Sequence, residues 1–287
     1  MRLVTYQSDK GPRVAALTEK GLVDLNRPDG SLPSCPKQLL AAWDELKPRA
    51  QAVVASGKGL IHESVPMLPV IPNPQKVIGI GLNYMDHAQE TSKKPPSEPI
   101  IFSKFPTAVR ADGEPIVLPR NSHEVDYEAE LVVVIGRGGK SIHRDQAFEH
   151  VAAYTCGNDV SARDWQFRKP GSQWLLAKSF DSFAPIGPVL VTADEILKPG
   201  NLDIQLRLNG QTLQKSNTNQ LIFPIEVLIE YVSSVCPLSP GDLIFTGTPA
   251  GVGFVRQPPL FLKPGDTVEV EVESIGTLTN SVVAEET

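Results

Sequence analysis

The sequence predicts a β-rich α+β protein, and two observations carry that prediction. After about residue 75, the chain divides into short apolar or alternating runs separated by Gly, Pro, Asn and Asp, which is typical of strands joined by turns. Only a few stretches show the apolar spacing that marks a helix. With 287 residues, 41% of them apolar and 21% charged, the chain can form one large domain with a small appendage.

The first 70 residues are expected to form a small α+β unit. Three strand-like runs come first, MRLVTY, RVAALTE and GLVDLN. A helix is expected over Lys37–Leu46, ending before Pro48, and a second short helix over residues 49–56. PMLPVIPNP, residues 66–74, has four prolines in nine residues and favours an extended linker. We therefore expect a small N-terminal domain over residues 1–70 and a larger domain over residues 75–287.

The larger domain is expected to be mostly β. Two helices are expected in it, over Arg144–Ala153 and Pro224–Ser233. Asn209-Gly210 predicts a β-hairpin, because this dipeptide fits a type I′ turn. The candidate strands are KVIGIGL, PIIFSKF, PIVLP, YEAELVVVIG, YTCGNDVS, PIGPVLVT, DIQLRLNG, DLIFTGTP and TVEVEVESIG.

Composition and charge narrow the function classes. A net charge of −6 without a Lys/Arg block argues against nucleic acid as a partner. No apolar run approaches the roughly 20 residues that span a bilayer, and we see no secretory signal, so we expect an intracellular, cytoplasmic protein, with an organellar matrix also open. Cys35, Cys156 and Cys236 are far apart, which argues against a disulfide framework or a thiolate zinc site. The composition favours a small-molecule enzyme.

An acidic row leads into the strongest apolar run. In EVDYEAELVVVIG, residues 124–136, a carboxylate stands at every second position from Glu124 to Glu130, and alternate residues of a strand share one face. A solvated strand end explains this row as well as a cation site does. The cation hypothesis needs a third ligand beside Glu128 and Glu130, and Asp159 at the end of a predicted strand is the best candidate. Such hard oxygen ligands suit Mg²⁺ or Mn²⁺, with Ca²⁺ also open.

Five motifs in order resemble the fumarylacetoacetate hydrolase family. They are GIGLNYMDHAQE, the Glu-x-Glu pair at 128–130, NDVSARD, WLLAKSFD and FTGTPAGVG. The resemblance runs from about Lys76 to Val282. The N-terminal region and the segments KSFDSFAPIGP and SNTNQ most resemble its domain-containing protein 2 subgroup. Members of the family act as acylpyruvate or fumarylpyruvate hydrolases, 2-oxo acid decarboxylases, oxaloacetate tautomerases and isomerases of hydroxydienedioates.

The resemblance implies a fold and a metal site. The larger domain should be a mixed β-sandwich roll that carries the catalytic site, and the protein should be a homodimer. Glu128, Glu130 and Asp159 should be the metal ligands, with Mg²⁺ as the expected cation.

The resemblance also gives catalytic roles to three residues that the sequence alone leaves ambiguous. A His-x-x-Glu pair such as His87 and Glu90 is more often structural than catalytic, but the family places a water-activating dyad at this position, followed here by the lid-like segment TSKKPPSEP. Lys178 lies in an apolar stretch and is either a snorkelling surface residue or a buried cation. The resemblance favours a buried cation that binds substrate oxygen beside the metal.

Four further residues are expected to bind substrate. The resemblance assigns Arg163 and Gln166 to the far end of the substrate, and Gly247 and Thr248 of the TGTP loop to a substrate carboxylate. The glycine-rich motifs do not predict a nucleotide site. TGTPAGVG lacks the Lys-Ser/Thr ending of a P-loop, and Tyr84 stands where a dinucleotide fingerprint needs its third glycine.

Together with the resemblance, these residues predict a divalent-metal-dependent enzyme that acts on small 2-oxo acids through a metal-bound enolate, and they favour an oxaloacetate tautomerase or decarboxylase. Two alternatives stay open at this point. One is an acylpyruvate hydrolase, for fumarylpyruvate or another 2,4-diketo acid, that uses a water activated by His87 and Glu90. The other is a catalytically inactive protein that binds a metal or a 2-oxo acid.

Overall fold

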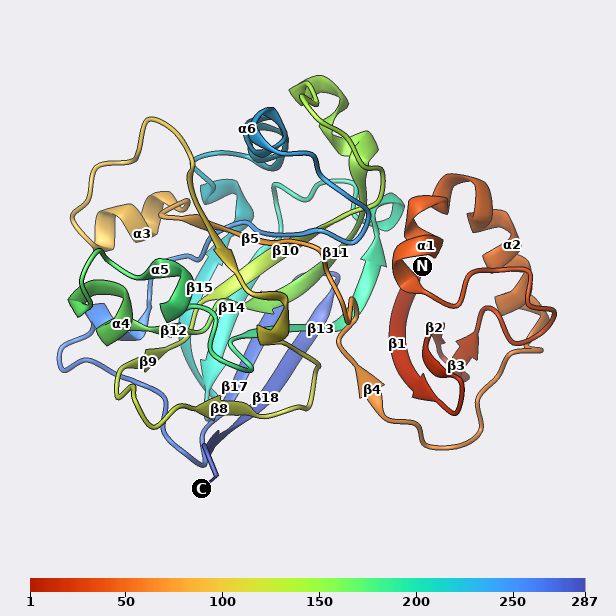
Figure 1. Cartoon of the computed structure of the whole chain (residues 1–287), viewed down its shortest axis with the longest axis horizontal. Coiled ribbons are helices and arrows are strands. Elements are labelled where there is room, and N and C mark those ends of the chain that lie inside the picture. Colours follow the sequence, from red (N-terminus) through yellow and green to blue (C-terminus); the bar gives the residue numbers. More distant parts are fainter. Residues whose placement is uncertain (287) are drawn as a thin grey trace.

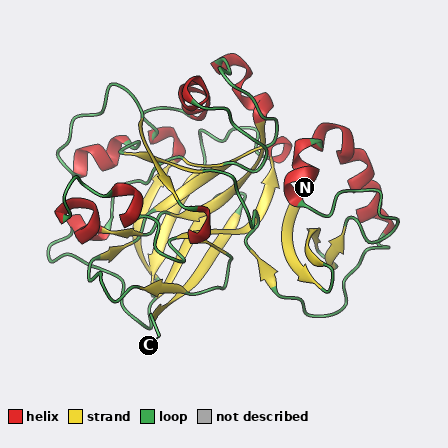
Figure 2. Ribbon diagram, in the orientation of Figure 1, coloured by secondary structure: helices red, strands yellow, loops and turns green. Residues whose placement is uncertain are grey.

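Strands dominate the protein and form three sheets of 11, 5 and 2 strands. The computed structural model describes residues 1–286, and Figure 2 shows how little helix accompanies the strands. The predicted β-rich α+β fold is therefore confirmed.

The large sheet mixes parallel and antiparallel pairs. Its strands are β1 (Arg2–Ser8), β2 (Gly11–Thr18), β3 (Gly21–Asp24), β4 (Met67–Leu68), β5 (Val77–Gly81), β6 (Ile100–Lys104), β7 (Val109–Arg110), β10 (Ala129–Ile135), β11 (Val151–Asn158), β13 (Ala184–Thr192) and β16 (Leu243–Phe245). They follow the order β3-β2-β1-β13-β11-β10-β16-β5-β6, with β4 beside β1 and β7 beside β13. β16 pairs in parallel with β5, and β13 with β7.

The smaller sheets complete the core. The five-stranded sheet has the order β15-β14-β17-β18-β8 and contains β8 (Ile116–Leu118), β14 (Asp203–Leu208), β15 (Gln211–Asn217), β17 (Thr267–Val272) and β18 (Gly276–Ala284). The third sheet pairs β9 (Val125–Asp126) with β12 (Ser161–Ala162). In β17, every second residue is buried, so one face of the five-stranded sheet packs inward while the other faces solvent.

The central strand β10 is buried on both faces, which explains its continuous apolar run. Leu131 and Val133 pack into one core cluster, together with inward side chains of β17. Val132 and Val134 pack into a second cluster with Leu3 and other side chains of the N-terminal region. The acidic row thus runs directly into a strand at the buried centre of the large sheet.

Helices are short and peripheral (Figure 1). They are α1 (Pro36–Ala41), α2 (Trp43–Ser56), α3 (Met85–Glu90), α4 (Arg163–Arg168), α5 (Trp174–Ala177) and α6 (Ile225–Val235), with five 3-10 turns, η1 (Pro106–Ala108), η2 (Arg144–His150), η3 (Ala193–Glu195), η4 (Thr218–Gln220) and η5 (Gly253–Val255). The expected helix over Pro224–Ser233 is present as α6, with Pro224 just before its first residue.

Two helix predictions were wrong in their bounds. The stretch Lys37–Leu46 is broken at Ala42, and Pro48 lies inside α2 instead of ending a helix, so the second predicted helix is the rest of α2. The expected helix Arg144–Ala153 is instead the 3-10 turn η2 followed by the start of β11. Residues 151–153 join the sheet because they pair with the end of β10, and that pairing overrides the local pattern.

The N-terminal region joins the large sheet. β1 pairs antiparallel with β13, and Figure 1 shows α1, α2 and β1–β3 gathered on one side of the molecule. The proline-rich segment 66–74 contributes the two-residue strand β4 to this edge and bends at residues 70–73. A division into domains at this segment stays a prediction. Within residues 1–286, the helices are all too short or too polar to cross a membrane.

Candidate metal centre

Three carboxylates meet where β10 begins and β11 ends. Ala129 pairs with Asn158 across these strands, and the backbone N–H of Asp159 donates to the carbonyl of Glu128 at 2.9 Å. The alternation along the strand adds Glu130 to the same face. One carboxylate oxygen each from Glu128, Glu130 and Asp159 can be chosen so that the three atoms lie within 4.8 Å of one another, and all three residues are buried.

This donor set fits a divalent cation. Burial raises the pKa of Glu130 well above its usual range, and the negative charges of Asp159 and Glu128 raise it further. Burial also raises the pKa of Glu128, but the Lys178 and Arg163 cations outweigh it and hold that pKa below its usual range. Since three buried carboxylates repel one another and resist desolvation, a cation between them would stabilise the cluster. Oxygen ligands of this kind suit Mg²⁺ or Mn²⁺.

Two buried lysines lie against the carboxylates. The Lys178 ammonium donates to Glu128 Oε2 at 2.9 Å, to Asp159 Oδ2 at 2.6 Å and to the Ser161 hydroxyl at 2.9 Å. Lys178 is therefore a buried cation and not a snorkelling surface residue. On its other oxygen, Asp159 accepts a hydrogen bond from Lys104 of β6. Burial lowers the pKa of Lys104 to about 8 even though Asp159 counteracts this effect.

Lys104 was not singled out from the sequence. The sequence did carry a signal, the position of Lys104 in PIIFSKF. Lys104 lies two residues after Phe102, so both side chains point to the same face of the strand, and both are buried. A lysine at a core-facing strand position needs an anionic partner, and Asp159 is that partner here.

Arg163 connects the acidic row to the first turn of α4. Its guanidinium donates to Asp126 Oδ2 at 2.9 Å, to Glu128 Oε1 at 2.6 Å and to Gln166 Oε1 at 2.8 Å. Asp126 is fully buried and also accepts the backbone N–H groups of Gly253 and Phe254, so it holds Arg163 and a loop instead of being solvated. Glu124 lies at the half-buried end of the row.

The His87–Glu90 pair lies on α3. His87 Nδ1 and Glu90 Oε2 are 3.2 Å apart, and the second Glu90 oxygen accepts the backbone N–H of Gly251 at 2.9 Å. With Nδ1 turned to the carboxylate, Nε2 is the ring nitrogen left for a substrate. The geometry that an oriented base requires is therefore present.

The loop after β16 closes the site from the other side. The backbone N–H of Gly247 donates to Glu130 Oε2 at 2.7 Å. Thr248 accepts a hydrogen bond at its hydroxyl from Gln214 Nε2 at 2.9 Å. Gln214 also accepts the backbone N–H of Ala129 through Oε1, so it joins the loop to β10, a link that the sequence analysis missed.

A small cavity of about 50 Å³ lies against part of this network, and Glu128 is the member of the acidic cluster that lines it. Its polar lining residues are His87, Thr91, Lys93, Glu128, Arg163, Gln166, Lys178 and Thr248. Its apolar walls include Phe102, Trp174 and Phe254. A cavity lined by a few polar and charged groups between aromatic side chains is the arrangement expected for binding a small anionic ligand.

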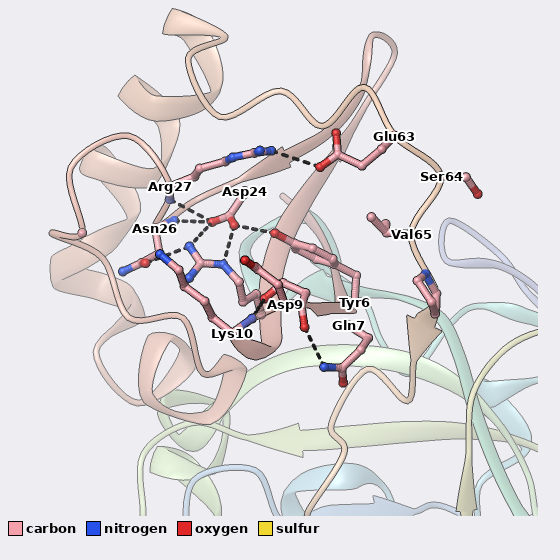
Figure 3. Close-up of a pocket in the computed structure, with 14 residues that line it drawn as sticks. Tyr6, Gln7, Asp9, Lys10, Asp24, Asn26, Arg27, Glu63, Ser64 and Val65 are labelled. Carbon is pink, nitrogen blue, oxygen red and sulfur yellow. Dashed lines mark hydrogen bonds and ion pairs between the residues drawn. The ribbon is translucent and has the colours of Figure 1, made fainter.

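A larger cavity, of about 670 Å³, lies in the N-terminal region (Figure 3). Its central carboxylate, Asp24, is already paired with neighbouring groups. It accepts hydrogen bonds from the Tyr6 hydroxyl at 2.5 Å and from the Arg13 guanidinium at 2.5 and 3.0 Å. These partners make the network a structural tie between strands, and the acidic cluster remains the candidate site.

The sequence of this chain is similar to those of known proteins. Residues 76–283 match the family model for the fumarylacetoacetate (FAA) hydrolase C-terminal domain. An oxaloacetate tautomerase fahd2 of Xenopus laevis is 46% identical over 99% of this chain and 90% of its own length. The human oxaloacetate tautomerase FAHD2A is 45% identical over 99% of this chain and 92% of its own length. Both relatives are named as mitochondrial.

Solved structures share the fold over the full chain. Fumarylacetoacetate hydrolase from Exiguobacterium antarcticum is 30% identical, with a TM-score of 0.86 over 99% of this chain and 100% of that one. Maleylpyruvate hydrolase from Sphingobium sp. SYK-6, in complex with manganese(II) and pyruvate, is 28% identical, with a TM-score of 0.83 over 100% of both chains.

Proposed function

This chain belongs to the fumarylacetoacetate hydrolase family of metal-dependent enzymes, and on that premise we propose that it is an oxaloacetate tautomerase. The observation that carries the proposal is the cluster of three buried carboxylates with the Lys178 ammonium bound to two of them. This cluster lies beside a cavity lined by Glu128, Lys178 and His87, the partner of Glu90. The names of relatives at 45–46% identity favour oxaloacetate over other 2-oxo acids.

Glu128, Glu130 and Asp159 would hold the cation, which we propose to be Mg²⁺ or Mn²⁺. When bound, the cation supplies Lewis-acid polarisation of the 2-oxo acid. The charges around it suit an anionic substrate. Four buried carboxylates of the region face three cationic side chains, so a bound divalent ion would make the net charge of the region positive. The carboxylates belong to Asp126, Glu128, Glu130 and Asp159, and the cations to Lys104, Arg163 and Lys178.

Side chains at three places in the site would bind and orient the substrate. Lys178 lies between two of the carboxylates and can stabilise the oxygen that becomes enolate-like. Arg163 and Gln166 line the same cavity and suit the carboxylate at the far end of a dicarboxylic acid. Thr248 lines the cavity and would bind the other carboxylate through its hydroxyl, whereas the Gly247 amide expected to help it already donates to Glu130.

His87 would move the proton. Because Glu90 holds Nδ1, Nε2 can take a proton from C3 of keto oxaloacetate and deliver it to the keto oxygen, which gives the enol. In the opposite direction, Nε2 takes the enol proton and delivers it to C3. Tautomerisation needs no attacking water, so the dyad acts here as a proton carrier. In the alternative acylpyruvate hydrolase, the same nitrogen would instead activate a water.

The proposal is tested by separating the possible products. The metal-loaded protein is mixed with oxaloacetate, ultraviolet absorbance follows the enol, and a coupled assay detects pyruvate. Fast enol–keto equilibration without pyruvate is expected. Pyruvate release would identify a decarboxylase, and inertness toward oxaloacetate with cleavage of acylpyruvates would favour the hydrolase. His87→Ala should lose the activity, and unchanged turnover would remove the dyad from the mechanism.

We further propose a homodimer and an intracellular location. The expectation of a cytoplasmic protein finds no support in the relatives, which are named as mitochondrial, so an organellar matrix stays open beside the cytoplasm. Light scattering should give about twice the chain mass of 31.1 kDa. A single 31.1 kDa species would contradict the dimer.

A further inference from the structure

One buried hydroxyl near the metal centre lacks a partner. Among the buried side-chain atoms of residues 1–286, only Tyr84 Oη and Asn158 Nδ2 make no hydrogen bond. Tyr84 is fully buried and lies just before α3, the helix that carries His87. Native proteins leave few buried polar groups unpaired, because such groups lose their hydration without compensation. The unpaired hydroxyl therefore points to a function outside folding.

The backbone around Tyr84 is fixed against the metal centre. The neighbouring Asn83 donates from its side chain to the carbonyl of Thr246 at 2.7 Å. The next residue of that loop, Gly247, donates its N–H to Glu130 at 2.7 Å. A Cβ atom on Gly247 would lie only 2.8 Å from the Cβ of Asn83, so the two segments are in close contact. Tyr84 is thus one residue away from the contact that anchors Glu130.

Glu130 is also the carboxylate of the cluster with the fewest partners. Glu128 is held by Arg163 and Lys178, and Asp159 by Lys104 and Lys178. Within the described residues, Glu130 receives one hydrogen bond, from the Gly247 amide. Burial raises the pKa of Tyr84, and the nearby charges of Glu130 and Asp86 raise it further, so the phenol keeps its proton and can donate it.

We propose that Tyr84 is a positioning residue for Glu130: in the metal-loaded protein its hydroxyl donates to the Glu130 carboxylate, directly or through one water, and fixes the orientation in which Glu130 binds the cation. This inference rests on the proposed metal site. Groups that hydrogen-bond to metal ligands set ligand orientation and basicity, and losing one typically lowers metal affinity about 10- to 100-fold. The cost of an unpaired hydroxyl in the free protein is the kind of stability loss that functional sites tolerate.

The test is Tyr84→Phe, which keeps the ring and removes only the hydroxyl. Tyr154→Phe is the matched control, because Tyr154 is another buried tyrosine of the same core cluster. Mn²⁺ binding is measured by calorimetry on the chelator-treated full chain, together with the melting temperature before metal is added. Tyr84→Phe should raise the Kd for Mn²⁺ about 10- to 100-fold. Its metal-free melting temperature should be equal to or above that of the wild type, because no hydrogen bond is lost.

Each other result has a definite meaning. If the wild type binds no Mn²⁺, the proposed metal site itself fails. If the wild type binds and Tyr84→Phe binds equally well, only the role of Tyr84 is overturned. A metal-free melting temperature that falls in Tyr84→Phe would show that the hydroxyl serves folding, and an equal loss of affinity in Tyr154→Phe would show a general effect of the core. Either result overturns the inference.

Discussion

Glu130 offers a direct test of the proposed metal site. Glu130→Gln keeps the acceptor for the Gly247 amide but removes the charge that a cation needs. Because burial already favours the neutral form of Glu130, the metal-free variant should melt at or above the wild-type temperature. Its affinity for Mn²⁺, measured by calorimetry, should fall at least about 100-fold, beyond the usual effect of losing a hydrogen-bond partner of a ligand.

Glu124→Gln is the control for this variant. Glu124 belongs to the same acidic row, but it pairs at the surface with Arg168, at 2.5 Å. Its replacement should leave Mn²⁺ affinity unchanged, since exposed ion pairs contribute little. Equal affinity in Glu130→Gln and the wild type would contradict the assignment of Glu130 as a ligand.

Tyr6 should make the free energy of unfolding depend on pH in the alkaline range. Burial, and then its hydrogen bond to Asp24, raise the pKa of Tyr6 from 10.0 to about 12. Between these two values, the unfolded chain loses this proton while the folded chain keeps it, so the free energy of unfolding falls as pH rises from 10 to 12.

Urea unfolding at pH 9 and pH 12, as approximate end points of that window, checks this prediction. The wild type should lose about 1–2 kcal/mol more than Tyr6→Phe across the window, because the variant has no phenol to titrate at this position. Other tyrosines contribute equally to both proteins and cancel in the comparison. Identical pH dependence of the two proteins would contradict the raised pKa.

At single residues, the sequence could predict which carboxylates converge but not which cations meet them. Glu128 and Glu130 share a face because strand side chains alternate, and this period is readable locally. Lys104 lies 55 positions before Asp159, its partner, so no local pattern joins them. The network around Asp24 was unreadable for the same reason, since its members come from different strands and turns.

The hairpin between β14 and β15 provides a test of the turn chemistry. Asn209 and Gly210 both have positive φ, 52° and 78°, as a type I′ turn requires. Gly210→Ala should therefore destabilise the protein by about 1 kcal/mol, measured by urea unfolding, because an L side chain is strained at this φ.

Gly200→Ala is a suitable control for the hairpin. Among the described residues, no atom lies within 4 Å of an added Cβ at either glycine, and only Gly210 has positive φ. Gly200→Ala should change the free energy of unfolding by less than about 0.5 kcal/mol. Equal effects of the two substitutions would show that backbone strain is not the cause.

Elements with a strong local signal were predictable, and elements decided by distant pairing were not. The Asn-Gly turn and the alternation in TVEVEVESIG are local features, and both gave correct elements. The stretch Arg144–Ala153 looked helical, but β10 takes residues 151–153 into the sheet. Pro48 was expected to end a helix, yet it lies in the second turn of α2, where only one backbone hydrogen bond is lost.

The whole molecule joins its N-terminal region to the catalytic part through one sheet. Arg2 pairs with Val191, and the terminal ammonium of Met1 donates to the Thr192 hydroxyl at 2.6 Å. Pairing across about 190 residues leaves no periodic trace in the sequence. The fold class was therefore predictable, whereas this continuous sheet was not.

We propose above that the acidic cluster holds a cation that the chain needs to interconvert enol and keto oxaloacetate. The most direct measurement is the rate of enol loss with chelator-treated protein, before and after Mg²⁺ or Mn²⁺ is added, against metal without protein. We expect little activity before metal is added, recovery with metal, and no recovery in Glu130→Gln. Full activity after chelation, or recovery in Glu130→Gln equal to that of the wild type, would contradict it.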